Sequence, residues 1–167
     1  MLRCPYVINC EEVFKWKGKI WVFLEFLEDG DLTNLPKNYS ENFCKYTMYQ
    51  VALGIQALHN QNILHRDIKA ENILHRSTTG DIKLADMGLS VILCEQEEYR
   101  KSVKGTTAFL SPEIAQGILY GKEVDIWAFG CFAYELASGK GKMPFGGMGE
   151  AGIIDAILDM NKPAPAI

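Results

Sequence analysis

The sequence predicts an α+β fold in which a short strand-rich part near the N-terminus precedes a longer, mainly helical part. Three observations support this prediction: two neighbouring runs of alternating apolar residues, one apolar stripe with helical spacing, and a later helix that is apolar on nearly every side. The 167 residues are enough for one domain with its own core, and they contain no internal repeat or low-complexity tract.

Two strands are predicted over residues 6–14 and 19–26, joined by a tight turn at Lys17 and Gly18. In the second strand Ile20, Val22, Leu24 and Phe26 lie on one face and alternate with Trp21, Phe23 and Glu25. Residues 27–30, Leu-Glu-Asp-Gly, break the alternation and end the strand pair.

The first helix is expected to be capped by Ser40 and to run to about His59. Its apolar residues recur at steps of four and three and form one stripe, made of Cys44, Met48, Val51, Ile55 and Leu58. Two short strands over residues 72–75 and 81–85 follow, and residues 77–80 join them.

A second long helix is predicted to open at Asp125 and to continue through Leu136. Because this helix is apolar nearly all round, we expect it to be buried on all sides. One more amphipathic helix is predicted from Ile153, Ile154, Ile157 and Leu158. Residues 147–152 fit the pattern G-x-G-x-x-G, but a helix and a loop precede them rather than a strand, so we interpret them as a loop and not a dinucleotide site.

Composition narrows the classes of partner. Hydrophobic residues make up 48% and charged residues 23%, which is an ordinary globular balance. The net charge of −4 argues against general nucleic-acid binding, and no apolar run is long enough to span a bilayer, so no membrane partner is expected. The five cysteines are scattered, which favours free thiols in a reducing compartment, and we expect a cytoplasmic protein.

Three short motifs suggest the chemistry. Residues 65–72 read His-Arg-Asp-Ile-Lys-Ala-Glu-Asn, residues 86–88 read Asp-Met-Gly, and residues 111–113 read Ser-Pro-Glu. In this order the three resemble the H-R-D, D-F-G and A-P-E elements of eukaryotic-type Ser/Thr protein kinases. The resemblance implies a partial protein-kinase-like fold, with residues 1–27 as the last strands of the small lobe plus the hinge, and residues 28–167 as most of the large lobe.

The resemblance also implies roles for single residues. Asp67 is the expected catalytic base, which orients a substrate hydroxyl, and Lys69 is expected to reach the γ-phosphate of ATP. Asn72 and Asp86 offer the hard oxygen ligands that suit Mg²⁺. Thr106 is expected to bridge Asp67 and Lys69, which indicates Ser/Thr specificity. Each residue taken singly has an ordinary explanation, such as a turn or a solvated charge.

Further residues are implied for ATP. Leu24 falls at the gatekeeper position, and the backbone of Glu25 and Leu27 is expected to face the adenine edge. Asp31 is expected to meet the ribose, and Leu74 and Asp86 complete the cofactor set.

The substrate is expected to be a protein with a Ser or Thr acceptor. By resemblance, Asp31, Glu71 and Glu135 lie where carboxylates of some kinases bind Arg upstream of the acceptor. Alternatively, Glu71 and Glu135 are structural and Asp31 only starts a helix. Ser102 is the candidate phosphosite, and Arg66 is expected to bind its phosphate group. The alternative is that Arg66 pairs with nearby carboxylates or backbone.

Three questions stay open at the level of sequence. The subgroup resembles the sterile-20-like kinases, with calcium/calmodulin-type kinases as the alternative. A pseudokinase or non-catalytic interaction module is the alternative to an enzyme. The chain has no glycine-rich loop ahead of the hinge and no Arg to pair with Glu113, so we expect an inactive, poorly soluble fragment of a truncated kinase domain.

Overall fold

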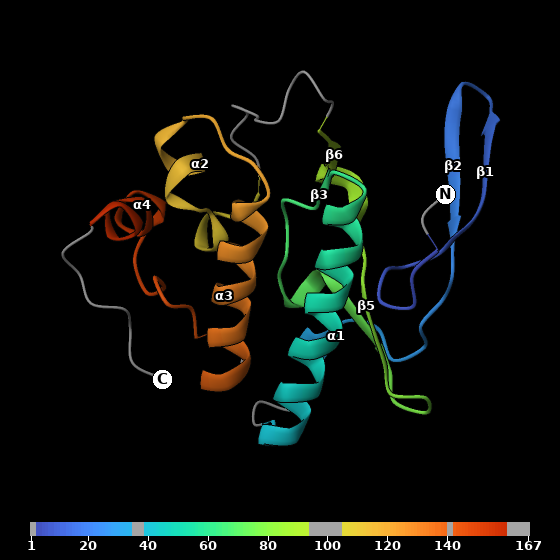
Figure 1. The fold of residues 1–167 in the computed structure, drawn as a ribbon, viewed down its shortest axis with the longest axis horizontal. Helices are drawn as coiled ribbons and strands as arrows, with labels where there is room; N and C mark the ends of the chain where they lie inside the picture. Colours follow the sequence, from blue (N-terminus) through green and yellow to red (C-terminus); the bar gives the residue numbers. More distant parts are fainter. Residues whose placement is uncertain (1–2, 35–38, 94–104, 140–141, 160–167) are drawn as a thin grey trace.

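The computed structural model describes residues 3–34, 39–93, 105–139 and 142–159 (Figure 1). The predicted α+β class is confirmed. Within the described residues, three antiparallel strand pairs accompany the helices: β1 (Cys10–Trp16) with β2 (Lys19–Leu24), β3 (Ile63–Leu64) with β6 (Val91–Ile92), and β4 (Ile73–Arg76) with β5 (Asp81–Leu84). The helices are α1 (Glu41–Asn60), α2 (Pro112–Gln116), α3 (Glu123–Ser138) and α4 (Glu150–Leu158), and short 3₁₀ turns η1 (Leu32–Asn34), η2 (Ala70–Asn72), η3 (Met87–Leu89) and η4 (Thr107–Phe109) lie between them.

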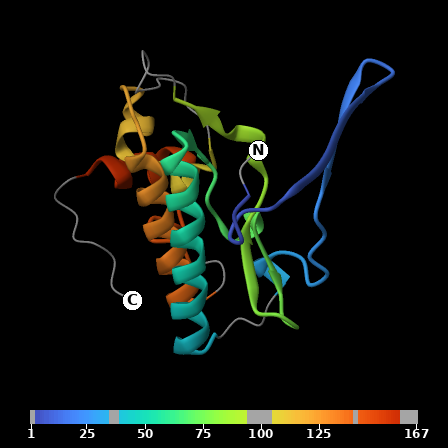
Figure 2. The ribbon, with the colours of Figure 1, turned by 45° about the vertical axis from the view of Figure 1, so that its right-hand side comes forward.

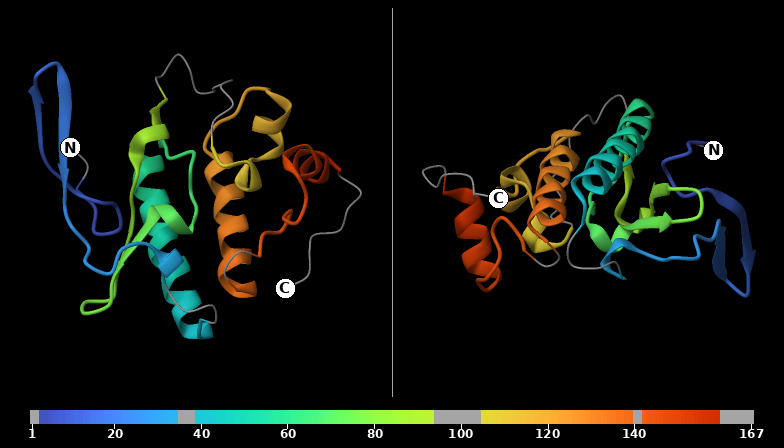
Figure 3. Two further views of the ribbon diagram at one scale, coloured as in Figure 1. Left: turned by 180° about the vertical axis from the view of Figure 1, so that it is seen from behind. Right: turned by 90° about the horizontal axis from the view of Figure 1, so that it is seen from below.

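The elements form successive layers, which the view from below separates most clearly (Figure 3). Helices α3 and α1 lie side by side, the β4–β5 hairpin packs on α1, and the β1–β2 hairpin projects from the far end (Figure 2). The main core lies between α1, α3 and the β4–β5 hairpin, around Val51, Ile55, Ile73, Leu84 and Phe132.

The β1–β2 hairpin forms around the predicted turn, where Lys17 and Gly18 both adopt positive φ. The first strand begins at Cys10, later than predicted, because the backbone before it pairs with β5 instead. Ile8 N–H donates to Leu84 O at 2.8 Å, and Leu84 N–H donates to Tyr6 O at 2.9 Å. The hairpin exposes apolar side chains along both strands, namely Val13, Phe14, Trp16, Ile20, Trp21, Val22, Phe23 and Leu24.

Helix α1 confirms its sequence prediction in detail. The Ser40 hydroxyl accepts a hydrogen bond from Phe43 N–H at 3.2 Å and caps the helix. The apolar stripe faces the core, and Val51 and Leu58 are each 1% exposed. At Gly54, a Cβ atom would lie only 2.7 Å from the Tyr6 carbonyl oxygen, so glycine lets α1 approach the N-terminal segment closely.

Helix α3 forms, but the expectation that it is buried on all sides is wrong. It begins at Glu123, and the face with Val124, Ala128 and Phe132 is buried. The opposite face is not covered by the described residues, and Ile126 is 55% exposed. There the helix lines an open cavity of about 640 Å³ with Trp127, Tyr134, Pro144 and Phe145. An apolar sequence indicates which faces of a helix can be buried. Whether they are buried depends on which other segments pack against the helix.

The last helix, α4, packs against α2 and η4 and buries Ala156 and Ile157. Gly149 caps it after a loop, so residues 150–152, which we interpreted as part of a loop, form its first turn, and that part of the interpretation is wrong. The segment directly before these glycines is a loop and not a strand. No helix in the described ranges has the length and apolar character to cross a membrane.

Candidate active site

The loop with the His-Arg-Asp motif is held by one buried carboxylate from α3. Asp125 is 0% exposed, and its two oxygens accept hydrogen bonds from the backbone N–H groups of His65 at 2.9 Å and Arg66 at 2.8 Å. His59 of α1 lies with Nε2 2.8 Å from Asp125 Oδ2. Arg66 has a φ of 68°, a conformation that non-glycine residues adopt at a cost. The Asp125 carboxylate therefore fixes the loop backbone just before Asp67.

His65 links this loop to the Asp-Met-Gly motif. Its Nε2 lies 2.9 Å from the carbonyl oxygen of Ala85, directly before Asp86, and its Nδ1 lies 3.3 Å from Asp67 N. Burial lowers the pKa of His65, against the attraction of Asp125. The neutral ring with its proton on Nε2 satisfies both contacts. His65 therefore holds the loop against the Asp-Met-Gly motif.

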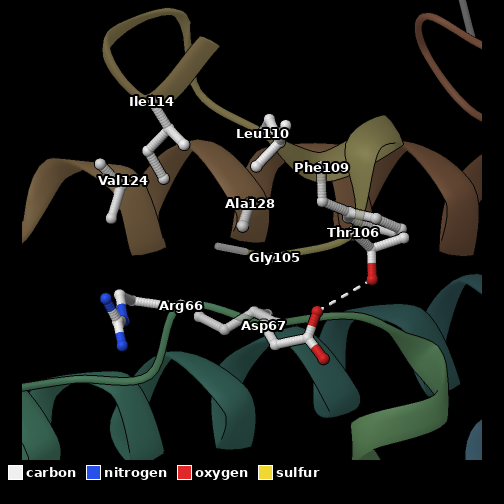
Figure 4. Close-up of a pocket in the computed structure, with 10 residues that line it drawn as sticks. Arg66, Asp67, Gly105, Thr106, Phe109, Leu110, Ile114, Val124 and Ala128 are labelled. Carbon is white, nitrogen blue, oxygen red and sulfur yellow. Dashed lines mark hydrogen bonds between the residues drawn. The ribbon is translucent and has the colours of Figure 1, made fainter. Parts of the chain in front are cut away.

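Asp67, Lys69 and Thr106 form a closed network. Figure 4 shows the bond between Thr106 and Asp67. Lys69 Nζ lies 2.9 Å from Asp67 Oδ2 and donates to Thr106 Oγ1 at 2.8 Å, and the Thr106 hydroxyl donates to Asp67 Oδ1 at 2.9 Å. Asn72 Nδ2 donates to the Asp67 carboxylate and to its backbone oxygen, both at 2.8 Å. Gly105 allows this approach, because a Cβ there would lie 2.8 Å from Arg66 O.

The network keeps Asp67 ionised. Burial by itself would raise the pKa of the Asp67 carboxyl, but the hydrogen bonds from Lys69 and Thr106, with the charge of Lys69, lower that pKa below its usual value. A carboxylate with a lowered pKa is a weak base that still accepts a hydrogen bond well. It is therefore suited to orient a substrate hydroxyl.

Asn72 and Asp86 offer oxygen atoms suited to Mg²⁺. Since the Asn72 amide nitrogen donates to Asp67, its Oδ1 is the atom that suits a cation. Asp86 is exposed and has a φ of 56°, and its Oδ1 accepts from Gly88 N–H at 3.1 Å. Among the described residues, no group of three or more His, Cys, Asp or Glu side chains could hold a metal. Two oxygen ligands fit Mg²⁺ that takes its remaining ligands from phosphate and water.

The start of the following segment is attached to the same loop. Met87 packs against the main core, and the Ser90 hydroxyl lies 3.3 Å from His65 O. Arg66 Nε donates to Leu89 O at 2.7 Å, and its Nη1 donates to the Tyr120 hydroxyl at 3.1 Å. Arg66 thus has backbone and side-chain partners here, and the phosphosite candidate Ser102 lies outside the described residues.

Three of the six residues predicted to bind ATP lie in or beside β4. Leu27 is buried with Ile8 and Ala85, Leu74 packs on this cluster, and Asp31 pairs with Leu74. Leu24 lies apart from the cluster, at the exposed end of β2.

The three predicted substrate carboxylates come from neighbouring segments. Asp31 Oδ1 accepts hydrogen bonds from the backbone and hydroxyl of Thr33, so it caps the η1 turn, as the structural alternative expected. Glu71 is exposed on η2, which contacts η1. Glu135 is buried on α3 and lines a small cavity with Thr33 and Ala70.

Comparison with known proteins decides the family. A model of the protein kinase domain matches residues 1–163. The chain belongs to the protein kinase family. It is 34% identical over 142 residues to the serine/threonine-protein kinase MST20 of Pyricularia oryzae, and this match covers 81% of the chain and 15% of the relative. It is 35% identical over 144 residues to mitogen-activated protein kinase kinase 1 of Arabidopsis thaliana, covering 83% and 40%.

A third relative is the serine/threonine-protein kinase sid1 of Schizosaccharomyces pombe, which is 38% identical over 122 residues, covering 72% of this chain and 26% of the relative. The chain thus spans between 15% and 40% of the length of these three relatives. The family assignment from the three motifs is confirmed, whereas the sterile-20-like subgroup stays a prediction.

The sequence motifs did not predict several residues in and around this candidate site. His59 was treated only as the end of a helix, although it contacts the carboxylate that holds the loop. Lys83 and Arg76 were not singled out, yet Lys83 Nζ lies 2.7 Å from Glu25 Oε1, and Arg76 Nε lies 2.9 Å from Glu28 Oε2. For Lys83 and Arg76 the sequence shows only a charged residue within a short strand. Such a residue does not indicate which acidic residue, about fifty positions away, will pair with it.

The network predicts an acidic titration for Asp67. Because its folded pKa lies below the unfolded value of about 3.9, the ionised carboxylate stabilises the fold above that pH, and this contribution is lost as the pH falls through the folded pKa. NMR titration of the carboxyl carbon should give a pKa below 3.9, and Lys69→Met should raise it.

Lys45→Met is the matched control, because Lys45 pairs with Glu41 on the exposed face of α1. This change should leave the pKa of Asp67 where it was. An Asp67 pKa that does not respond to Lys69→Met contradicts the network.

Proposed function

We propose that the protein carrying this chain is a Ser/Thr protein kinase that transfers the γ-phosphoryl group of ATP to a protein hydroxyl. The observation that supports this best is the closed network of Asp67, Lys69 and Thr106, because an ionised Asp beside a Lys and a hydroxyl suits phosphoryl transfer. The relatives named as Ser/Thr kinases support the same class.

Each residue has a role in this proposal. Asp67 orients the acceptor hydroxyl and takes its proton late in the transfer, and Lys69 offsets negative charge that develops on the transferred group. Asn72 Oδ1 and Asp86 hold Mg²⁺, and Thr106 keeps Lys69 and Asp67 in register. Bound Mg-ATP supplies the phosphoryl group and a cation that spreads its charge.

The nucleotide site is assigned to the segment after β2 and to β4. We propose that Leu24, Glu25, Leu27, Asp31 and Leu74 bind the adenosine part of ATP, beside Asp86. This assignment divides the chain into residues 1–27, which belong to the small lobe and hinge, and residues 28–167, which belong to the large lobe. The proposed compartment is the cytoplasm, since Cys4, Cys10, Cys44 and Cys131 of the described residues are free thiols.

A non-catalytic interaction module is the second candidate. The open apolar cavity beside α3 and the exposed apolar faces of the β1–β2 hairpin favour it, because large exposed apolar surfaces mark contacts with other protein parts. The same surfaces support the expectation that the isolated chain is inactive and poorly soluble, which stays a prediction. Catalysis by the whole protein distinguishes the two candidates.

Replacing the proposed base should nearly abolish turnover. Asp67→Asn in the whole protein should lower kcat about 10²- to 10⁴-fold, because the amide cannot accept the proton of the acceptor hydroxyl. The measurement is transfer of labelled phosphate from Mg-ATP to a Ser/Thr peptide library. Asp155→Asn, the same change on an exposed side of α4, is the matched control and should leave kcat unchanged.

Two outcomes would contradict the enzyme. One is a whole protein that binds Mg-ATP but phosphorylates no peptide or protein. The other is an Asp67→Asn variant that turns over as fast as the unchanged protein. The first outcome favours the interaction module.

We further propose that the enzyme prefers substrates with Arg upstream of the acceptor, since Asp31, Glu71 and Glu135 come from segments in contact. A positional peptide library should show enrichment of Arg two or three residues before the acceptor. Glu71→Gln should weaken that enrichment several-fold, because a neutral amide binds guanidinium less well. Glu150→Gln, an exposed change on α4, is the control. If Glu71→Gln leaves the enrichment of Arg intact, these three carboxylates are not the cause of the preference.

A further inference from the structure

Arg76 at the end of β4 reaches the segment that follows β2. Its Nη2 donates a hydrogen bond to the Phe26 carbonyl oxygen at 2.7 Å, and its Nε donates to Glu28 Oε2 at 2.9 Å. Its Nη1 lies 3.4 Å from Asp81 Oδ2 on β5. The planar guanidinium carries several donors in a fixed fork, so one side chain sets the position of a backbone carbonyl and a carboxylate together.

The bond to Phe26 O also sets the direction of the next N–H group. The described chain contains no cis peptide bond, and in a trans peptide the carbonyl and the following N–H point in opposite directions. With the Phe26 carbonyl held toward Arg76, the Leu27 N–H points away from Arg76. Among the residues that the structure describes, this N–H has no protein acceptor, which is rare for a residue that is 2% exposed.

Two nearby N–H groups, in contrast, have acceptors within the protein. Glu25 N–H donates to Asn9 O at 3.0 Å, and Gly30 N–H donates to Leu27 O at 3.3 Å. Leu27 itself packs against Ala85, which directly precedes the proposed Mg²⁺ ligand Asp86. The unused donor therefore borders the proposed nucleotide site.

We infer that Arg76 is a positioning residue for nucleotide recognition: it orients the Phe26–Leu27 peptide so that the Leu27 N–H is presented to an acceptor atom of the purine base. This inference rests on the proposed function, because it assigns a base to the site. Adenine has an acceptor nitrogen on its pairing edge, where guanine has an N–H donor. A fixed N–H donor therefore favours ATP over GTP.

The simpler explanation is that Arg76 only contributes exposed ion pairs, which stabilise proteins little. The two explanations differ in the importance of the carbonyl bond. Glu28→Gln removes the ion pair between Glu28 and Arg76 but leaves the bond from Arg76 to Phe26 O. Arg76→Gln removes both the ion pair and that bond. Arg76→Lys keeps the charge but cannot reproduce two donors in a fixed fork.

The first experiment needs no nucleotide. Amide hydrogen exchange is measured on the whole protein and on its Arg76→Gln and Glu28→Gln variants. Arg76→Gln should speed exchange at Glu25 and Gly30 about tenfold, because their bonds depend on the ordered segment, while Val51 of α1 stays protected. Glu28→Gln should change these rates far less. Unchanged exchange in Arg76→Gln overturns the inference.

The second experiment measures the dissociation constants of Mg-ATP and Mg-GTP for the whole protein. Arg76→Gln should weaken Mg-ATP about three- to tenfold, which is the range for one hydrogen bond, and should weaken Mg-GTP less. The dissociation constant of Mg-ATP for Arg76→Lys should lie between those of Arg76→Gln and the unchanged protein. The dissociation constant for Glu28→Gln should be close to that of the unchanged protein. Equal weakening of both nucleotides overturns the inference.

The two experiments separate the possible failures. A whole protein that binds neither nucleotide contradicts the proposed function, and the exchange rates then decide by themselves whether Arg76 orders the Phe26–Leu27 peptide. A protein that binds Mg-ATP with an affinity that Arg76→Gln does not change contradicts the inference alone.

Discussion

The buried carboxylate of Asp125 is the contact on which the rest of the site depends. A carboxylate with no exposed surface is costly unless its oxygens are hydrogen-bonded, and here three donors meet it, from His59, His65 and Arg66. These donors come from α1 and from the loop, while Asp125 belongs to α3. One side chain thus joins the two central helices to the backbone of the loop that carries Asp67.

That anchoring explains how the loop keeps a strained conformation. Arg66 occupies a left-handed backbone region, and the bond from its N–H to Asp125 offsets part of that cost. Asp67 follows at once, so its carboxylate emerges at a fixed place, where Lys69, Thr106 and Asn72 meet it. A positioned and ionised carboxylate is what phosphoryl transfer asks of the protein, since that reaction depends mainly on geometry and charge.

The sequence predicted the local features well and the long-range ones poorly. The cap at Ser40, the stripe of α1 and the β4–β5 hairpin depend on residues close in sequence, and each forms as predicted. The start of β1 and the burial of α3 depend on which segments lie nearby, and both predictions were wrong. The residues proposed for catalysis were found because a family motif names them. His59 and Arg76 have no such motif, and their partners lie 66 and about fifty positions away.

The most direct test of the anchoring role of Asp125 is amide hydrogen exchange at His65 and Arg66 in the whole protein that carries this chain, unchanged and with Asp125→Asn. Asparagine keeps the volume but has one acceptor oxygen instead of two, so at least one of the two amides must lose its acceptor. The predicted result is slow exchange at both amides in the unchanged protein. In the variant, exchange at one or both should be faster by about tenfold or more, with α1 still protected. Equally slow exchange at both amides in Asp125→Asn would contradict the anchoring role.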